Sequence, residues 1–344
     1  MFTKPKRLHR WDTIWIVTPS RGLPSVYPHI FEAWINTLLQ LGFKIKELPH
    51  TRDDAVLLYN SPKLRADDIN NAFADTEISA IFTSIWWDDC IRILPYLDIE
   101  LIKRNPKVFL WYSDTTIINT FLNQAWLVTF NGPSVMAWFS QWNDHEKQFH
   151  EDILDFFFSN KNFIYSSYNY YSNGYPSWKN SDSTWKLKEH IPSTWCRILQ
   201  WTWTFEWHLF GGCIEVLEFM KSTPYWPHID FWNGKILFLD ISADDGILIN
   251  QVKCILINNW IQWVLHRISG LLIWRARNYS EDDKRRLEKV LLDVISWEFW
   301  MHDLPIITNM DFWHTDPQWI LPLWVTAQFD INYNSFKLLE SPFL

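Results

Sequence analysis

Glycine is scarce in this chain. Its 344 residues include only 9 glycines, whereas average usage of about 7% would give about 24. The scarcity excludes collagen-like and glycine-rich linker classes, and an aromatic content of 18% excludes a disordered chain. Tryptophan shows the opposite deviation: there are 25, of which roughly twenty exceed ordinary usage. The two deviations are similar in size, which suggests that some tryptophans stand where the backbone needs glycine.

Cysteines and long apolar runs are also few. The four cysteines (Cys90, Cys196, Cys213 and Cys254) form no CxxC pair, which favours reduced thiols in a cytoplasmic protein over a disulfide framework. The basic N-terminus is followed by only a short apolar run, Thr13–Val17, so we predict no secretory signal. The sequence contains no run of about 18 apolar residues, so we predict no membrane span. A net charge of −8 argues against nucleic acid or an anionic membrane as a partner.

Strand and helix signals alternate through the first half of the chain. Apolar, β-branched runs predict strands, and apolar residues spaced three or four apart predict helices. The predicted strands are 13–17, 44–48, 80–85 and 108–111, and the predicted helices are 28–41, 64–74, 90–97, 99–104 and 114–124. Such alternation predicts a mostly parallel sheet covered on both faces.

A change of character at residues 160–190 divides the chain. This stretch is polar and aromatic, with turn residues, and we interpret it as an inter-domain connection. We expect an N-terminal domain over 1–165, a linker over 166–190 and a C-terminal domain over 191–344. The last contains predicted strands at 235–240, 271–274 and 305–309, helices at 248–262 and 280–296 with Ser280 as N-cap, and a hairpin of 325–332 and 336–339.

Ser113 has the most informative surroundings. The apolar strand 108–111 ends, the serine follows closely, and a helix begins. A serine in such a turn is exposed at the carboxyl edge of the sheet, beside the free N–H groups and partial positive charge of the helix end. Those are the parts that a nucleophile and an oxyanion hole require. The alternative is that Ser113 is a simple N-cap.

Two other residues complete a candidate constellation. His314 lies in a loop after a predicted strand, and Asp240 ends the strongly apolar strand 236–239. A carboxylate there could orient a histidine, although a surface histidine and a strand-end turn residue are the ordinary alternatives. His145 and His150 are spaced by five rather than four residues, so they do not predict a zinc site.

In order and spacing, these segments resemble the LD-carboxypeptidase family of serine peptidases, which includes the microcin C self-immunity proteins. The resemblance covers nearly the whole chain. Its motifs lie at 11–20, 84–89, 94–98, 111–115, 129–133, 210–213, 236–240, 274–275, 311–315 and 321–324. It implies an α/β fold in which a three-layer, parallel-sheet N-terminal domain carries the nucleophile and a smaller α/β C-terminal domain carries the acid and the histidine. It implies no metal and no organic cofactor.

The resemblance also implies roles for individual residues. Ser113 matches the family's nucleophile, His314 its general base, and Asp240 stands at the position of its glutamate, one methylene shorter. An aspartate orients the histidine in other triads, although the shorter reach puts the geometry in question. The family's oxyanion hole falls on the backbone of Trp87 and Asp114.

Four residues match substrate-binding positions of the family. Trp86 and Asp88, in the loop 85–89, resemble the self-immunity branch rather than the arginine-containing loop of peptidoglycan enzymes. Trp178 resembles an aromatic that stacks on a nucleotide base, and is otherwise an ordinary linker residue. Glu206 matches a carboxylate lining the pocket, and is otherwise a solvated loop charge.

We therefore expect a cytoplasmic homodimer that hydrolyses an amide at a carboxyl-terminal residue through an acyl-enzyme. The expected substrate is a small peptide or peptidyl-nucleotide, with aminoacyl-nucleotides favoured. One alternative is cleavage of the L,D-bond of cytoplasmic muropeptides during wall recycling. The other is a catalytically dead binding protein that keeps the fold.

Many of the tryptophans occupy glycine positions of the family pattern. They are Trp11, Trp15, Trp34, Trp86, Trp87, Trp111, Trp126, Trp207, Trp274, Trp313 and Trp324, whereas Trp178, Trp226, Trp232 and Trp319 are not among them. A bulky residue where glycine is needed costs of order 1–3 kcal/mol per site. We hypothesise that a codon translated here as tryptophan, with UGA the natural candidate, is read as glycine in the source. If the tryptophans are real, we expect a filled oxyanion hole and no peptidase activity.

Overall fold

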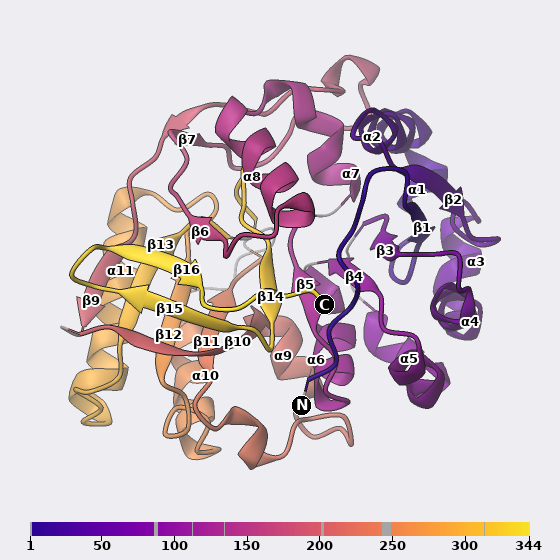
Figure 1. Ribbon diagram of the computed structural model, residues 1–344. Coiled ribbons are helices and arrows are strands. Elements are labelled where there is room, and N and C mark those ends of the chain that lie inside the picture. The colour runs from indigo at the N-terminus through magenta and orange to yellow at the C-terminus, as the bar shows by residue number, and fades with distance from the viewer. Residues whose placement is uncertain are drawn as a thin grey trace.

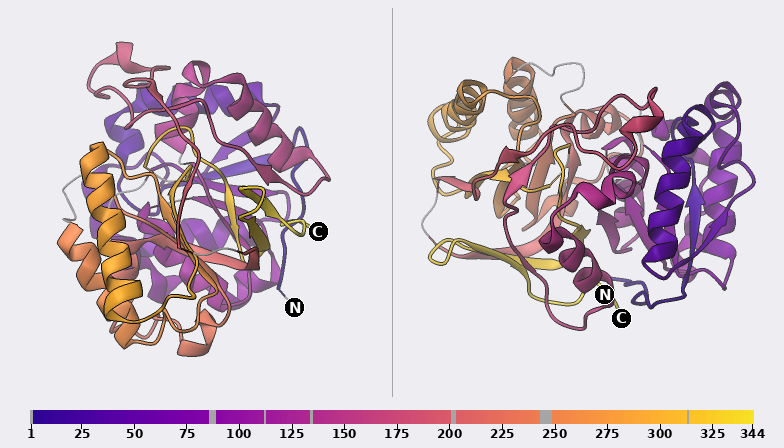
Figure 2. Two further views of the ribbon diagram at one scale, coloured as in Figure 1. Left: turned by 90° about the vertical axis from the view of Figure 1, so that its left-hand side faces the viewer. Right: turned by 90° about the horizontal axis from the view of Figure 1, so that it is seen from above.

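Two β-sheets form the framework of the protein. The computed structural model describes residues 2–85, 89–111, 113–133, 135–200, 203–242, 249–312 and 314–344. Within them, a six-stranded and an eight-stranded sheet lie side by side with helices packed around them (Figures 1 and 2). This arrangement confirms the α/β fold. No helix in these ranges is long and apolar enough to cross a membrane.

The first sheet has the strand order β14-β5-β4-β3-β1-β2. Five of its strands are parallel and come from the first half of the chain, and β14 is antiparallel to β5. The strands are β1 (Thr13–Val17), β2 (Lys44–Glu47), β3 (Ala80–Thr83), β4 (Val108–Trp111), β5 (Thr129–Asn131) and β14 (Leu321–Leu323). The helices are α1 (Leu23–Val26), α2 (Pro28–Gln40), α3 (Ala55–Asn60), α4 (Pro62–Ala74), α5 (Ile99–Arg104), α6 (Thr116–Gln124), α7 (Val135–Trp138) and α8 (Lys147–Phe158).

The second sheet has the order β6-β16-β15-β10-β11-β12-β13-β9. Its parallel centre runs from β10 to β13, and antiparallel strands flank it on both sides. The strands are β6 (Ile164–Tyr165), β9 (Arg197–Gln200), β10 (Phe205–Cys213), β11 (Ile236–Asp240), β12 (Gly270–Trp274), β13 (Ile306–Met310), β15 (Thr326–Asp330) and β16 (Ser335–Leu338). The helices are α9 (Ile214–Met220), α10 (Ile249–Ile261) and α11 (Glu281–Leu292), and β7 (Tyr170–Tyr171) pairs with β8 (Ile191–Pro192).

The chain crosses between the two sheets more than once. Strand β14, from residues 321–323, extends the first sheet, and β6, from residues 164–165, pairs with β16 in the second. The two ends of the chain are also neighbours, since Leu344 N–H donates to the Pro5 carbonyl at 2.9 Å (Figure 2). These crossings tie the two sheets together, so the loops between them have a fixed framework.

Most predicted elements are present, with differences that have physical causes. Ser280 caps α11 in a reciprocal capping box with Asp283, as its sequence position predicts. Residues Cys90–Tyr96 form a 3₁₀ helix rather than an α-helix, and Pro95 lies inside it, where it cannot donate an α-helical hydrogen bond. Strand β10 and helix α8 were missed. The strand contains Gly211 and Gly212 and lacks a clean alternation of apolar and polar residues.

Several tryptophans occupy backbone conformations that favour glycine. Six of the described tryptophans have φ between 57° and 75°, in the left-handed region that costs an L-residue about 1–2 kcal/mol. They are Trp11, Trp126, Trp185, Trp263, Trp300 and Trp324. Three of these, Trp11, Trp126 and Trp324, are among the family's glycine positions. The backbone therefore supports the hypothesis of recoded glycines.

Buried indole groups bear on the same hypothesis. A buried tryptophan N–H ordinarily finds a hydrogen-bond acceptor, and leaving it unsatisfied costs about 1–3 kcal/mol. Among the described residues, buried indole nitrogens without a partner occur at Trp15, Trp34, Trp111, Trp178, Trp232, Trp260 and Trp274. Trp15, Trp34, Trp111 and Trp274 coincide with family glycines, whereas Trp178 and Trp232 do not, so unsatisfied indoles are not confined to those positions.

Candidate active site

Ser113 lies in a sharp turn after β4. It has φ of 63° and is 3% exposed, and it begins a short 3₁₀ turn, Ser113–Thr115, that leads into α6. A serine in the left-handed region stores backbone strain, and such strain clusters at functional sites. The strand, the serine and the helix start are therefore arranged as predicted, but the serine is buried rather than exposed.

Asp114, the next residue, ties neighbouring loops to this turn. Its carboxylate accepts hydrogen bonds from the Ser20 hydroxyl at 2.9 Å and from the Cys90 N–H at 3.0 Å. Ser20 follows β1 and Cys90 follows the loop after β3. The three carboxyl-edge loops of adjacent strands thus converge beside Ser113. Burial, and secondarily the Asp114 carboxylate, raises the pKa of the Cys90 thiol well above its usual value.

The loop after β3 contains the other predicted oxyanion group. Trp86, Trp87 and Asp88 lie outside the described residues. On one side of them, the Thr18 and Ser84 hydroxyls are 2.9 Å apart. On the other side, Asp89 forms an ion pair with the fully buried Arg65 at 2.7 Å. Both ends of this loop are therefore anchored.

His314 and Asp240 are in direct contact. His314 Nδ1 is hydrogen-bonded to Asp240 Oδ2, and the two side chains are 1% and 0% exposed. Asp240 ends β11, and His314 follows β13, two strands away in the same sheet. The aspartate reaches the histidine despite being one methylene shorter than the family's glutamate. This pairing is the one that orients the base in a triad.

The Ser113 turn contacts the strand next to Asp240. Thr116, in the first turn of α6, accepts a hydrogen bond on Oγ1 from the Cys213 N–H at 3.0 Å. Cys213 is the register partner of Asp240 in the parallel β10–β11 pair. A Cβ at the preceding Gly212 would lie 2.3 Å from Thr116, so only glycine permits this approach. The contact brings the two halves of the proposed triad to the same junction between the sheets.

Glu215 stabilises this junction by hydrogen bonds and was not identified from the sequence. It lies in the first turn of α9, where its carboxylate accepts from the Cys213 thiol at 2.8 Å. It also accepts from the Ser242 N–H at 2.8 Å and the Ser242 hydroxyl at 2.9 Å. Burial, Glu215 and Asp240 all raise the pKa of the Cys213 thiol. Glu215 therefore fixes the chain directly after Asp240, and its only sequence signal is an acidic residue at a helix start.

Trp178 lines an aromatic cavity near the Ser113 turn. The cavity has a volume of about 530 Å³. Trp178 stacks on Tyr175 with ring centroids 4.5 Å apart and meets Tyr27 edge-on at 5.7 Å. Arg21 and Ile85 also line it. Arg21 directly follows Ser20, the residue bonded to Asp114. The cavity thus opens beside the loops that converge on Ser113.

Glu206 is not part of this junction. It is exposed, and its carboxylate accepts from the Gln328 amide at 2.7 Å. It lies at the start of β10, seven residues before Cys213 at the other end, a separation of about 23 Å along a strand. The structure therefore fits the alternative that Glu206 is a solvated charge, because the regular strand carries it away from the junction.

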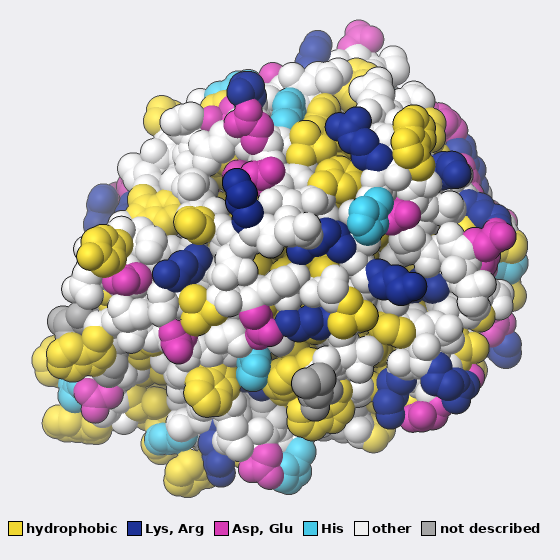
Figure 3. Space-filling view, in the orientation of Figure 1, with side chains coloured by type: hydrophobic (Ala, Val, Ile, Leu, Met, Phe, Trp, Pro, Cys, Tyr) yellow, Lys and Arg dark blue, Asp and Glu magenta, His cyan; other side chains and the backbone are white. Residues whose placement is uncertain are grey.

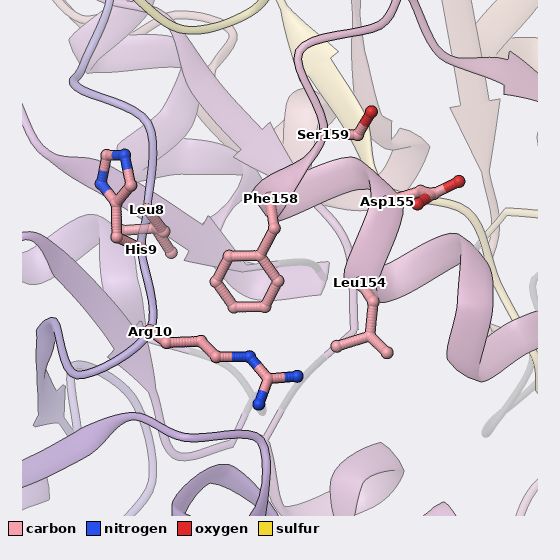
Figure 4. Close-up of a pocket in the computed structure, with 7 residues that line it drawn as sticks. All are labelled: Leu8, His9, Arg10, Leu154, Asp155, Phe158 and Ser159. Carbon is pink, nitrogen blue, oxygen red and sulfur yellow. The ribbon is translucent and has the colours of Figure 1, made fainter.

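A second cavity lies between the N-terminal segment and α8. The cavity, about 400 Å³, is lined by the N-terminal segment and α8 and contains none of the predicted site residues (Figure 4). In the view of Figure 3, acidic and basic side chains are scattered with hydrophobic ones between them. No group of three His, Cys, Asp or Glu side chains in the described ranges is placed to hold a metal ion.

Comparison with protein families gives two matches. Residues 14–132 match the LD-carboxypeptidase N-terminal domain, and residues 207–329 match the LD-carboxypeptidase C-terminal domain. The matched ranges together span well over half of the chain. They contain Ser113, Asp240 and His314, which lie in the segments that carry the resemblance.

Two relatives match over most of their length, and a third matches over less than half of it. A Vibrio cholerae protein with a carboxypeptidase name is 24% identical over 334 residues, covering 97% of this chain and 96% of its own. The microcin C7 self-immunity protein MccF of Escherichia coli is 23% identical, covering 96% of this chain and 93% of its own. A Bacillus subtilis protein named for murein peptide carboxypeptidase activity is 30% identical over 131 residues, which is 38% of this chain and 40% of its own.

Solved structures share the fold. An MccF-like protein from Streptococcus pneumoniae, in complex with AMP, superposes with a TM-score of 0.84 at 25% identity, covering 95% of this chain and 98% of its own. MccF in complex with aspartyl sulfamoyl adenosine gives a TM-score of 0.85 at 22% identity, covering 99% and 100%.

Proposed function

Because this chain belongs to the LD-carboxypeptidase family and is a serine-type carboxypeptidase, we propose that Ser113, His314 and Asp240 form its catalytic triad. The observation that carries the proposal is the buried His314–Asp240 hydrogen bond beside the strand that contacts the Ser113 turn. In this assignment Asp240 holds Nδ1 of the imidazole, and Nε2 takes the serine proton.

The proposed reaction is hydrolysis through an acyl-enzyme. The Ser113 oxygen attacks the carbonyl of the amide while His314 takes its proton. His314 then delivers that proton to the leaving amine, and water hydrolyses the resulting ester. The N–H groups of Asp114 and Trp87 are proposed to hold the oxyanion. The start of α6 next to Asp114 adds the partial positive charge of a helix N-terminus.

For the substrate we propose an aminoacyl-nucleotide. The aromatic cavity of Trp178, Tyr175 and Tyr27 offers ring faces and edges to a nucleobase. The chain is similar to MccF over nearly its whole length, and the similar protein from S. pneumoniae was solved with AMP. These observations favour a nucleotide-bearing substrate over a plain peptide.

The experiment compares two substrates on one preparation. Turnover of an aspartyl sulfamoyl adenosine analogue and of a muropeptide tetrapeptide is measured for the unaltered chain, Ser113→Ala and Trp178→Ala. In protein made with UGA read as glycine, we expect hydrolysis of the first substrate only, loss of turnover in Ser113→Ala, and a raised KM in Trp178→Ala. Trp297→Ala is the matched control, since Trp297 is 69% exposed and lines no cavity described above. Full activity of Ser113→Ala contradicts the triad.

Two alternatives have distinct signatures. Hydrolysis of the tetrapeptide alone favours muropeptide recycling. The similarity to the B. subtilis protein over 131 residues supports this alternative. Ligand binding with no Ser113-dependent turnover favours a catalytically dead homologue. The same preparation should be made with UGA read as tryptophan and as glycine, because a filled oxyanion hole predicts inactivity only in the first.

We also propose a cytoplasmic location and a homodimer. The four cysteines are unpaired thiols, three of them buried, which fits a reducing compartment. Sedimentation equilibrium measures the subunit number directly, and a monomer at micromolar concentration contradicts the dimer.

A further inference from the structure

Arg275, just after β12, carries a buried charge that the proposed chemistry does not use. Its guanidinium lies 2.5 Å from the Asp311 carboxylate, and the two side chains are 0% and 1% exposed. The same guanidinium donates to the Ser193 hydroxyl at 2.7 Å and lies over the Tyr171 ring at 4.6 Å. Burying an ion pair is costly unless its geometry is good and its remaining hydrogen bonds are satisfied, so the position of this pair beside the His314 loop calls for an explanation.

Asp311 begins the loop that carries His314. Its carbonyl accepts the Trp319 N–H at 2.7 Å, which closes residues 311–319 into a compact loop. The Trp319 indole in turn donates to the Ser166 carbonyl at 3.0 Å. The first residue of the loop, Asp311, therefore contacts Arg275, and its last residue, Trp319, contacts the segment around residue 166.

Arg277 acts at the other side of His314. Its Nε donates to the Asn173 carbonyl at 2.7 Å, and its charge favours the ionised form of the buried Asp316. Asp316 and Ser172 exchange two backbone hydrogen bonds, at 2.7 and 3.0 Å. Thus Asp311, three residues before His314, is held by Arg275, and Asp316, two residues after it, is held through its backbone by Ser172.

We propose that Arg275 is a positioning residue for the reaction, which holds the His314 loop through Asp311 so that the imidazole stays aligned with Asp240. His314 has φ of 45°, a strained conformation that persists only when its surroundings fix it. Misplacing a catalytic group by about 1 Å costs about 100-fold in rate. The inference rests on the proposed role of His314 as general base.

The test separates positioning from simple folding. Arg275→Met removes the charge at similar length, and Arg275→Lys keeps a charge without the fork of donors. Arg197→Met is the matched control. Arg197 lies on the edge strand β9 of the same sheet, opposite Thr308 of β13, and its ion pairs are with Glu281 and Glu288, at 2.8 and 3.2 Å, rather than with a residue of the 311–319 loop. The measured quantities are KM and kcat per active site, with active sites counted by a fluorophosphonate.

A positioning role predicts that kcat per titrated site falls about 10- to 100-fold in Arg275→Met, with KM changed less than about threefold. We expect kcat per titrated site to recover partly in Arg275→Lys and to stay unchanged in Arg197→Met. If Arg275→Met does not fold, the double variant Arg275→Met/Asp311→Leu, which removes both charges together, replaces it with the same expectation.

Two results would overturn the inference or its premise, and they are distinguishable. A folded Arg275 variant with unaltered kcat per titrated site, in a protein that Ser113→Ala inactivates, sinks the positioning role alone. Full activity of Ser113→Ala sinks the proposed function and the inference that rests on it.

Discussion

Asp240 and His314, 74 positions apart in the chain, meet through a hydrogen bond between Oδ2 and Nδ1. Both side chains are almost completely removed from solvent. In such a setting a carboxylate fixes the tautomer of the imidazole and stabilises the imidazolium that forms when the base takes a proton. The buried contact means that a change at Asp240 acts on the state of His314 directly.

Asp240→Asn is therefore expected to lower kcat by about 10⁴-fold, as loss of the carboxylate does in other triads. KM should change little, because Asp240 contacts the base rather than the proposed substrate cavity. Steady-state kinetics on the cleaved substrate measures both constants. Asp240→Glu keeps the charge and should retain far more activity, and equal loss in the two variants would mean that packing rather than charge matters.

Ser113→Gly is expected to make the protein both inactive and more stable. Ser113 has φ of 63°, and glycine relieves about 1–2 kcal/mol of left-handed strain, less the extra entropy of an unfolded glycine, about 0.5–1 kcal/mol. Ser113→Ala removes the same hydroxyl without relieving the strain, so it serves as the control. Urea unfolding measures the difference, which these values put at about 0–1.5 kcal/mol in favour of glycine. A glycine variant less stable than the alanine variant would contradict stored strain at this serine.

The sequence predicted the local parts of the site and not its long-range supports. Ser113 was identifiable because an apolar strand, a serine and a helix start are adjacent along the chain. Trp178 and Glu206 were both predicted from the sequence to bind substrate. The structure separates them because Trp178 lies in an irregular segment that folds back beside the β1 loop, whereas Glu206 is fixed at the start of a regular strand.

The supports of His314 were invisible for a different reason. Arg275 and Asp311 are far apart in the chain and meet only through the parallel pairing of β12 with β13. Glu215 contacts Cys213 only two positions away, yet its hydrogen bonds to Ser242 depend on the β10–β11 pairing. Spacing along a single chain carries no signal for contacts that tertiary pairing creates.

Asp316 should make stability fall as pH rises. Burial raises the pKa of its carboxyl to about 7 from an ordinary 3.8, so between about pH 4 and 7 the folded state holds a proton that the unfolded state has released. The free energy of unfolding should then fall with rising pH by up to about 1.4 kcal/mol per pH unit. Asp316→Asn cannot titrate, and urea unfolding at pH 4.5 and 6.5 should show a flatter dependence in the variant. Identical slopes would contradict the raised pKa.

Recoded glycines predict the mass of the protein made by its own source. If UGA is read as glycine there, the intact mass must be lower than that of a chain with 25 tryptophans. Intact-mass spectrometry of natively expressed protein decides this without any assay of activity. A mass that matches 25 tryptophans would refute recoding.

Trp300→Gly tests the same hypothesis on stability. Trp300 has φ of 57° and is 77% exposed, so its removal relieves left-handed strain and gives up little buried area. We expect the free energy of unfolding to rise by about 1 kcal/mol.

Trp297 is the matched control: it is 69% exposed and lies inside the helical turn Asp293–Glu298, where φ is not positive. Trp297→Gly should destabilise by about 1 kcal/mol, as glycine does in a helix interior. If the free energy of unfolding rises in one variant and falls in the other, backbone conformation rather than the loss of an indole ring decides the effect, since the two exposed tryptophans are only three positions apart. Destabilisation by both would count against glycine as the residue that this backbone requires at position 300.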